Sequence, residues 1–369
     1  MTNVLVICEF GCANKNSTGH LVSQIPNLLD GAEVEIVDAS SMPRPFRRLY
    51  DALERRNRAG SLKKLVALLG LLSASVTRRG KFDHVIVVSN PFLTLLLPSA
   101  LWRRRRATLH YLTFDLFPET LKATSLAIPP WAYSLVQSLR NRNLRRADGI
   151  FVIGRDFRQH LSAQKVDSKL IYTPLWIGAT EAAQPVAPSI MEEKTPNEKI
   201  RLNFFGNIGQ VQDFGEVFRL LDTNAAFSLD VYGAGAKSKS IAAEGHGRAH
   251  FYGAVPFQDR AKVFEPGSIG LVPQSTTLVG LAVPSKAFYY WSRGLPVLFL
   301  GCRNSELGQI ISESPELGLV VPPGSQLADI DVKLQAMAKN INDEKIISIC
   351  ADLRSKAQSA FLSALNIER

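Results

Sequence analysis

The sequence predicts an α/β protein in which two doubly wound domains face each other across a cleft. The chain has 369 residues, which is too long for one ordinary core and suits two domains. Short apolar runs rich in β-branched residues alternate with longer helical patterns, as in parallel sheets covered by helices. A segment rich in proline and alanine interrupts this alternation once, in the middle of the chain.

The first domain is predicted to span residues 1–178. Strands are expected at residues 4–8, 33–37, 85–89, 108–114 and 150–153, and helices at 18–29 and 133–146. The run at 85–89 is almost continuously apolar, which suits a parallel strand covered on both faces.

The second domain is predicted to span residues 201–348, after a linker at 179–200 that contains Pro185, Pro188 and Pro196. Strands are expected at residues 202–205, 228–232, 250–252, 269–272, 297–299 and 318–321, and helices at 216–222 and 286–293. Residues 349–369 are predicted to form a C-terminal helix that packs back on the first domain. The cleft then lies at the carboxyl ends of both sheets.

Composition excludes several classes of protein. Four cysteines in a chain of this length form no disulfide framework, and no second cysteine pair with metal-ligand spacing accompanies Cys8 and Cys12. The sequence opens without a basic secretory leader. The apolar run at 65–76 is shorter than the about 20 residues that cross a bilayer, so it predicts a buried or an interfacial helix. We expect a cytoplasmic protein with no metal.

Positive charge is concentrated in the first half of the chain. Residues 1–178 hold 25 basic and 13 acidic side chains, a net charge of +12, whereas the remainder has a net charge of −2. Arg103, Arg104, Arg105 and Arg106 directly follow an apolar stretch. Basic residues beside apolar ones favour the anionic inner membrane surface, and the sequence lacks the interleaved aromatic residues of a nucleic acid groove. A solvated basic surface without a partner is the alternative.

The loop after the first predicted strand is long and contains Gly11, Asn16, Gly19 and His20. It is not a G-x-G-x-x-G sequence, which disfavours a dinucleotide site on this domain. Its position at the carboxyl end of a strand suits the acceptor side of the cleft, although a plain surface loop explains it equally well.

Two carboxylates follow the fourth predicted strand. Asp115 stands at the tip of that strand, and Glu119 lies four residues later. A carboxylate at this edge could take the proton of an attacking hydroxyl group. The alternative is that Asp115 caps the next turn.

The second domain contains two glycine turns and a helix start that suit an anionic ligand. Gly206, Asn207, Gly209 and Gln212 follow its first strand, and Gly233 follows its second. Such turns expose backbone N–H groups and let a ligand approach closely, although tight turns alone would need the same residues.

Pro284 can begin a helix, Ser285 could cap it, and Lys286 falls in its first turn. A cation is unfavourable at that end of a helix unless an anion such as a diphosphate binds there. The alternative is a lysine that points into solvent.

These segments together resemble the GT-B glycosyltransferases of bacterial polysaccharide assembly, in the Pro-Ser-Lys branch. The matching segments occur in the same order as in the family and extend along nearly the whole chain. They are 115–119, 147–153, 206–212, 251–255, and 284–286 with 294–297. The resemblance implies a GT-B fold and transfer of a sugar from a nucleotide-diphosphate donor, with a UDP-sugar favoured, to a lipid-linked oligosaccharide acceptor.

The resemblance also implies where the substrates bind. The donor would lie on the second domain, on residues drawn from the two turns and the Pro-Ser-Lys region: Gly206, Asn207, Gly209, Gln212, Gly233, Gln274, Gly280, Leu281, Ser285 and Lys286. The acceptor would bind the first domain at the inner face of the membrane, for exopolysaccharide synthesis. No metal or other cofactor would be required, because a lysine and helix amides neutralise the leaving diphosphate.

The sequence departs from this family at two positions. Leu281 and Tyr289 stand where many retaining relatives carry glutamates, so the stereochemistry cannot be carried over. An inverting displacement with Asp115 as base is slightly preferred. Two other functions stay open, a sugar-nucleotide 2-epimerase of the same fold and a non-catalytic protein that binds the membrane surface.

Overall fold

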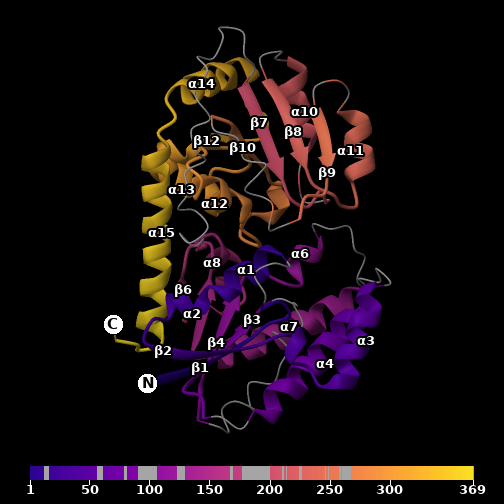
Figure 1. The fold of residues 1–369 in the computed structure, drawn as a ribbon, viewed down its shortest axis with the longest axis vertical. Helices are drawn as coiled ribbons and strands as arrows, with labels where there is room; N and C mark the ends of the chain where they lie inside the picture. The colour runs from indigo at the N-terminus through magenta and orange to yellow at the C-terminus, as the bar shows by residue number, and fades with distance from the viewer. Residues whose placement is uncertain are drawn as a thin grey trace.

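Two six-stranded parallel sheets, one above the other, form the body of the molecule (Figure 1). The computed structural model describes residues 1–11, 16–55, 61–78, 81–89, 106–122, 129–166, 169–176, 200–209, 212, 214–223, 227–245, 247, 249–256, 259 and 267–368. This architecture confirms the predicted fold class. The predicted linker falls outside the described residues except for Ile200, which begins a strand.

The N-terminal sheet is built from apolar parallel strands. These are β1 (Thr2–Ile7), β2 (Ala32–Val37), β3 (His84–Val88), β4 (Thr108–Thr113), β5 (Gly149–Val152) and β6 (Leu170–Tyr172), in the spatial order β2-β1-β3-β4-β5-β6. β3 is buried along its whole length, as its apolar run predicts. β6 was not predicted, because three half-buried residues give no clear apolar run. The strand order reverses beside β1, and ligands of doubly wound sheets bind at the carboxyl ends near such a reversal.

The helices of this domain connect the strands. They are α1 (Ser17–Ser23), α2 (Ile25–Leu28), the 3-10 turn η1 (Ala39–Ser41), α3 (Arg44–Arg55), α4 (Ser61–Thr77), α6 (Glu119–Lys122), α7 (Pro130–Arg146) and α8 (Phe157–Ser162). The single helix predicted at 18–29 is divided into α1 and α2. Pro26 stands in the first turn of α2, where its missing N–H is tolerated and the preceding helix has ended.

The C-terminal sheet repeats the arrangement. Its strands are β7 (Ile200–Phe205), β8 (Phe227–Tyr232), β9 (Ala249–Gly253), β10 (Ile269–Pro273), β11 (Val297–Leu300) and β12 (Gly318–Val321), in the order β12-β11-β10-β7-β8-β9. The connecting elements are α10 (Phe214–Thr223), α11 (Ser238–Glu244), the 3-10 turns η4 (Thr276–Leu278) and η5 (Pro315–Leu317), α12 (Lys286–Trp291), α13 (Glu306–Glu313) and α14 (Leu327–Lys339). The strand order of this sheet reverses between β7 and β10. The crevice at that reversal faces the corresponding crevice of the N-terminal sheet.

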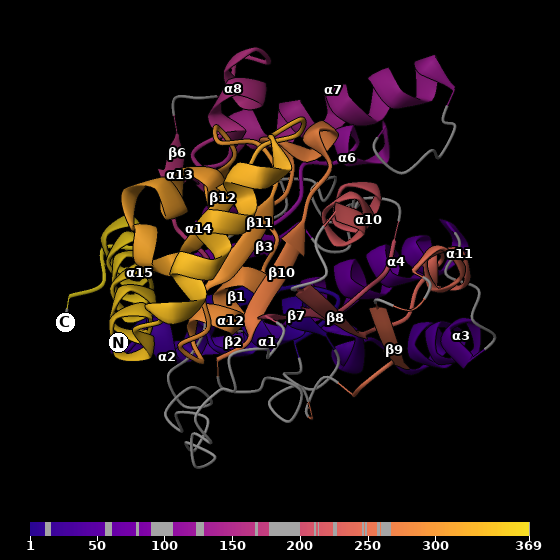
Figure 2. The same cartoon turned by 90° about the horizontal axis from the view of Figure 1, so that it is seen from above.

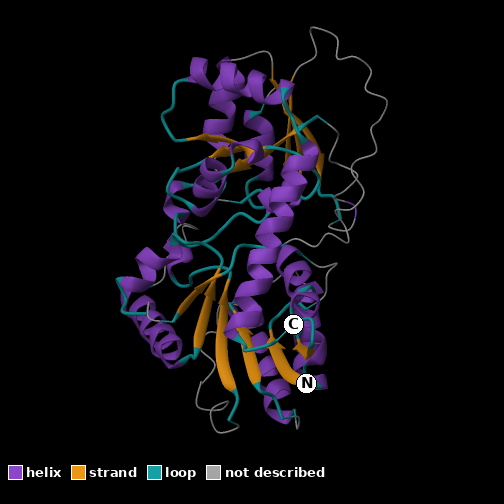
Figure 3. Ribbon diagram, turned by 90° about the vertical axis from the view of Figure 1, so that its left-hand side faces the viewer, coloured by secondary structure: helices purple, strands orange, loops and turns teal. Residues whose placement is uncertain are grey.

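A long C-terminal helix, α15 (Asp343–Ala364), runs along one side of both domains (Figure 3). It packs on α12 and η5 above, and on α2 and β6 below. The ring of Phe361 lies 4.4 Å from that of Phe151 and 5.2 Å from that of Trp176, and all three side chains are buried. The helix therefore closes one flank of the N-terminal sheet, and begins at Asp343 rather than at residue 349.

Candidate active site

A cavity of about 500 Å³ lies between the two domains. Most of its wall comes from the carboxyl ends of C-terminal strands and the segment that leads into α12, and two residues come from the start of α1. The lining residues are Asn16, Ser17, Phe205, Gly206, Asn207, Gln212, Val255, Pro273, Gln274, Leu278, Ala282, Val283, Pro284, Ser285, Lys286 and Tyr289. The sequence thus placed its predicted cleft correctly.

Lys286 places a buried amino group on this wall. Its Nζ has no hydrogen-bond partner among the described residues and lies 3.9 Å from the centre of the Phe204 ring. Burial lowers the pKa of Lys286 to about 7, because a low-dielectric surrounding disfavours the charged form. An anion entering the cavity would supply the missing partner and favour the ammonium form. The side chain does not extend into bulk solvent, which answers the alternative that the sequence left open.

Ser285 does not cap α12, contrary to the sequence prediction. Its backbone is helical, with φ −62° and ψ −21°, and its side chain accepts no capping hydrogen bond. A capping residue normally has extended backbone angles, from which its oxygen can reach the free N–H groups. Ser285 lines the cavity instead, directly beside Lys286.

The turn after β7 is held close to the cavity by two glycines. Gly206 has φ +125°, a conformation that side chains rarely adopt. A Cβ on Gly233 would lie 2.0 Å from the Gly206 carbonyl oxygen, so only glycine lets the turns after β7 and β8 pack together. The Gly209 N–H donates to Gln212 Oε1 over 2.8 Å, which closes the turn.

The structure brings six of the ten predicted donor residues to the cavity wall. These are Gly206, Asn207, Gln212, Gln274, Ser285 and Lys286. Gly209 and Gly233 shape the turns behind the wall, while Gly280 and Leu281 belong to the segment that carries wall residues Leu278 and Ala282. Gln274 ties that segment to β10, because its Nε2 donates to the Ala282 carbonyl over 3.1 Å.

The N-terminal domain also contacts the wall segment that contains Gly280, Leu281 and Ala282. The Leu116 N–H donates to the Leu281 carbonyl over 2.8 Å, and Asp115 pairs with Ala282 in an isolated antiparallel bridge. The Gly280 N–H donates to Asp156 Oδ2 over 2.8 Å. One wall of the cavity is therefore fixed by contacts that cross between the domains.

Asp156 is a residue that the sequence analysis missed. Its Oδ2 also accepts the Glu306 N–H at the start of α13 over 3.1 Å, while Oδ1 has no hydrogen-bond partner among the described residues. Burial raises its pKa, and the backbone N–H groups of Gly280 and Glu306 oppose that effect. Its position just after β5, at the carboxyl end of a parallel strand, was the available signal.

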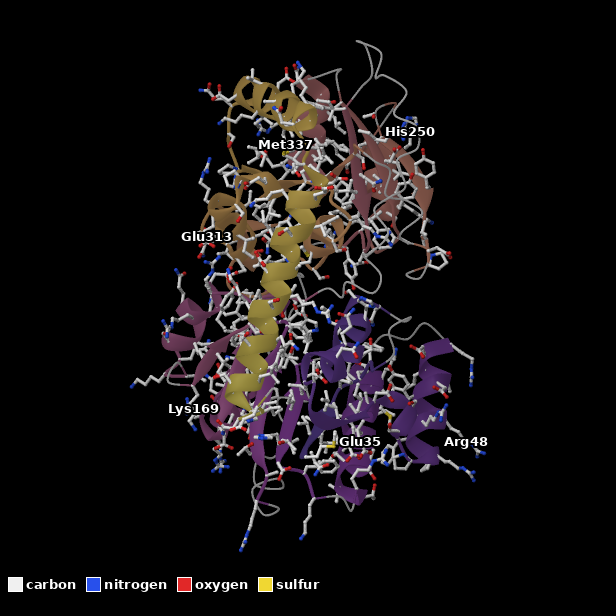
Figure 4. The ribbon with its side chains drawn as sticks, turned by 60° about the vertical axis from the view of Figure 1, so that its left-hand side comes forward. Glu35, Arg48, Lys169, His250, Glu313 and Met337 are labelled. Carbon is white, nitrogen blue, oxygen red and sulfur yellow. The ribbon has the colours of Figure 1, made fainter. Side chains whose placement is uncertain are left out.

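Charged contacts next to Asp156 reinforce this junction. Arg155 pairs with Glu306 and with Glu313, two residues of α13 (Figure 4 labels Glu313). Tyr172 Oη donates to Glu306 Oε1 over 2.7 Å. Glu306 is buried, and its carboxylate accepts hydrogen bonds from Arg155 and Tyr172 of the N-terminal domain. These contacts join the two domains at this point.

Asp115 lies at the end of β4, where the domains meet. Ser89 Oγ anchors the backbone here, because it accepts the Asp115 N–H over 3.4 Å and the Phe114 N–H over 2.9 Å. The side chain is exposed, and Asp115 is not among the residues that line the cavity. Desolvation by the surrounding protein raises its pKa to about 6. No hydrogen bond from this carboxylate to a turn is seen in the described part of the chain, so the structure gives no support to the capping alternative. A carboxylate poised near pH 6 can act as a general base.

The Glu119 carboxylate is buried and fully hydrogen-bonded by neighbouring side chains. Arg140 Nη1 donates to its Oε2 over 2.6 Å and Arg140 Nη2 to its Oε1 over 2.9 Å, and Gln137 and Gln164 also donate to Oε1. Burial would raise its pKa, but Arg140 and the two amides outweigh burial and lower the pKa. A carboxylate with both oxygens occupied and a lowered pKa is a poor proton acceptor, which argues against the predicted catalytic role.

The predicted acceptor-side loop is only partly at the cavity. Asn16 lines the cavity and caps α1 by accepting the Gly19 N–H over 2.8 Å. His20 is buried, and its ring lies 5.6 Å from that of the wall residue Tyr289. Gly11 packs against β2 instead, where a Cβ would lie 2.8 Å from Ile36. Residues 12–15 lie outside the described chain.

The described residues contain neither a candidate metal site nor a candidate membrane span. In the described parts of the chain, no group of three or more His, Cys, Asp or Glu side chains could hold a metal ion. None of the described helices combines the length and apolar character that a membrane span needs. Of the predicted membrane arginines, Arg103, Arg104 and Arg105 lie outside the described residues, and Arg106 is exposed.

Comparison with known proteins identifies relatives of both domains. Residues 20–176 match the family described as "Glycosyl transferase 4-like domain". The whole chain is 26% identical to a probable glycosyltransferase, WbjE of Pseudomonas aeruginosa, of which it covers 96%.

Solved structures share the fold over nearly the whole chain. The HepE protein of Anabaena in complex with UDP has a TM-score of 0.61 at 12% identity, with 99% of this chain and 97% of that chain covered. The lipopolysaccharide outer core galactosyltransferase WaaB has a TM-score of 0.60 at 13% identity, with 99% of each chain covered. Sucrose-phosphate synthase of Thermosynechococcus elongatus has a TM-score of 0.66 at 12% identity, covering 99% of this chain and 96% of that chain.

Proposed function

Because this chain is a glycosyltransferase of the GT-B fold, we propose that it moves a sugar from a nucleotide-diphosphate donor to a lipid-linked oligosaccharide in bacterial polysaccharide synthesis. A UDP-sugar is the favoured donor, since HepE structures contain UDP or UDP-glucose. The acceptor would bind the N-terminal domain at the inner face of the membrane.

The observation that carries the donor proposal is Lys286. A buried lysine without a hydrogen-bond partner is costly unless an anion binds beside it. The cavity in front of Lys286 is also lined by Gly206, Asn207 and Ser285, which surround an anion with a glycine turn, an amide and a hydroxyl group. We propose that the donor diphosphate binds here, and that Lys286 supplies the positive charge that the leaving diphosphate needs without a metal.

The proposed transfer is a single displacement. The acceptor hydroxyl oxygen forms a bond to the anomeric carbon, its proton passes to the Asp115 carboxylate, and the bond from that carbon to the diphosphate breaks with the electron pair leaving on the diphosphate. This assigns Asp115 as general base and inverts the anomeric configuration. The match to a glycosyl transferase domain favours this reaction over 2-epimerisation.

Binding of a panel of UDP-, GDP- and dTDP-sugars tests the donor proposal. We expect calorimetric binding of a UDP-sugar and weakening by about 10- to 150-fold in Lys286→Ala, which removes a charged hydrogen-bond donor. The melting temperature of the free variant shows whether the fold is kept. Equal donor affinity in the variant would overturn the phosphate role of Lys286, and no binding of any nucleotide would favour a non-catalytic protein.

A further inference from the structure

Exposed apolar side chains gather on one layer of helices. Apart from Met1, the described residues include ten large apolar side chains that are exposed, and eight of them lie on α3, α4 and α7: Leu49, Leu62, Leu65, Leu69, Val76, Trp131, Leu135 and Leu139. Helices α3, α4 and α7 lie on the same face of the N-terminal sheet, opposite α2 and α15 (Figures 1 and 2). The helices that carry these eight exposed side chains therefore share one side of the N-terminal domain.

Helix α4 is apolar on both faces. Leu62, Leu65, Leu69 and Val76 recur at helical spacing and are exposed, while Val66, Ala67, Leu71 and Ala74 on the other side are buried in the core. No aspartate or glutamate occurs in the helix. A helix that only covers a soluble core carries polar residues on its outer face, so the outer leucine row of α4 is suited to contact with an apolar neighbour.

Helix α7 continues the pattern with an aromatic anchor. Trp131, Leu135 and Leu139 recur every four residues, and Trp131 is 72% exposed. Arg142 and Arg146 follow on the same face and are exposed, and the helix contains no acidic residue. Tryptophan beside leucine and arginine is typical of segments at the boundary between lipid tails and headgroups.

Helix α3 adds positive charge to the layer. Arg44, Arg47, Arg48 and Arg55 are all exposed, and Figure 4 shows Arg48 at the outer edge of the molecule. The layer thus presents leucines and a tryptophan together with arginines. That combination complements a surface that is anionic outside and apolar beneath, which is an anionic lipid bilayer.

We propose that α3, α4 and α7 form a docking surface that lies in the plane of an anionic bilayer. Leu62, Leu65, Leu69 and Trp131 enter the boundary below the headgroups, while the arginines bind lipid phosphates. The proposal rests on the proposed function in one respect, which is that the protein could reach a lipid-linked acceptor from such a surface. It assigns membrane contact to these helices, in addition to the contact that the sequence predicted at Arg103–Arg106.

Vesicle co-sedimentation of the full chain tests the surface. The probes are vesicles of phosphatidylcholine alone and of phosphatidylcholine with phosphatidylglycerol. The variants are Leu65→Gln/Leu69→Gln and Arg47→Gln/Arg48→Gln, and the matched control is Val332→Gln/Lys333→Gln on exposed α14, where Val332 is 69% exposed.

We expect the wild type and the control to bind only vesicles that contain phosphatidylglycerol. The arginine variant should bind about 30-fold more weakly, since each of the two basic residues near an anionic membrane contributes about fivefold. The leucine variant should lose at least tenfold at low and high salt, because hydrophobic insertion is not screened. Equal binding by the leucine variant and the wild type would overturn the proposal.

Two further measurements separate the possible failures. UDP binding by the same variants should equal that of the wild type, since no substituted residue lines the cavity. Vesicle binding without nucleotide binding would contradict the proposed function alone, and nucleotide binding without vesicle binding would contradict the docking surface alone. A wild-type dimer that Leu65→Gln/Leu69→Gln converts to a monomer, with no vesicle binding, would make the layer a contact between two copies and would overturn the proposal.

Discussion

Lys286 makes donor binding sensitive to pH. Burial lowers its pKa to about 7 from the ordinary 10.5, and a bound diphosphate would raise it again. Between these values, donor binding must take up a proton, so affinity for a nucleotide-sugar should fall as pH rises above about 7, by at most tenfold per pH unit. The stability of the protein without donor depends on pH in the opposite direction. Between about pH 7 and the ordinary pKa of 10.5, the unfolded chain binds more protons than the folded chain, so the free energy of unfolding rises with pH.

Calorimetry at about pH 8, in buffers of different ionisation enthalpy, measures this proton uptake directly. Lys286→Met is the matched control, since it keeps the length of the side chain and cannot titrate. Proton uptake that persists in Lys286→Met would assign the effect to another group.

Asp115 should set the acidic limb of the turnover profile. Desolvation by the surrounding protein raises its pKa to about 6, and only the ionised form accepts a proton, so kcat should fall as pH decreases through about 6. Asp115→Asn should lower kcat by about 10²- to 10⁴-fold and leave donor affinity unchanged. NMR of the product should show an inverted anomeric centre, and a retained configuration would exclude Asp115 as the base.

At the residue scale, the sequence predicted roles that depend on local chain order and failed on roles that depend on distant partners. Lys286 could be found because Pro284 and Ser285 mark a helix start where a cation is unfavourable without a ligand. The ion pair of Glu119 could not be predicted, because Arg140 belongs to another helix 21 residues later and no neighbouring residue of Glu119 indicates the pairing.

At the scale of elements, the segment between η4 and α12 depends on the loop after β5. Asp156 fixes Gly280 by a hydrogen bond, and His160 Nε2 donates to the Val279 carbonyl over 3.1 Å. Gly280 has φ +72°, and a Cβ there would lie 2.6 Å from the Asp156 carbonyl oxygen. Asp156 is therefore a positioning residue, which acts on the donor through the wall that it holds.

Replacing Asp156 should affect donor binding more than the chemical step. Asp156→Ala leaves two buried N–H groups without an acceptor, so we expect about 2–4 kcal/mol lower stability and about tenfold higher donor KM, with kcat changed less. Asp156→Asn keeps an acceptor oxygen and should restore much of both. A variant that loses stability while donor KM stays at the wild-type value would show that the wall does not depend on Asp156.

The strands were predictable because each is a short apolar run bounded by turn residues. Their parallel pairing followed from the alternation with helices. Contacts such as Asp156 with Gly280 were not predictable, since they join positions 124 residues apart whose meeting is decided by how the two sheets face each other.

At the scale of the whole molecule, α15 joins the two domains along one side. Phe361 is fully buried in the flank of the N-terminal sheet, although it follows the C-terminal sheet in the chain. Phe361→Ala should lower the free energy of unfolding by about 3–5 kcal/mol, as for other buried aromatic truncations. Ser363→Ala, at an exposed position on the same helix, should change it by less than about 0.5 kcal/mol. Urea unfolding measures both, and equal midpoints for the two variants would contradict this role of α15.

The position of α15 also has a consequence for how the chain matures on the ribosome. The residues of α15 that cover Phe151 and Trp176 are translated after both sheets, so the nascent N-terminal domain emerges with an open apolar seam. A chain that stalls before residue 361 keeps that seam uncovered and becomes a target for chaperones and proteases. The core of the N-terminal domain is therefore complete only once α15 has been translated.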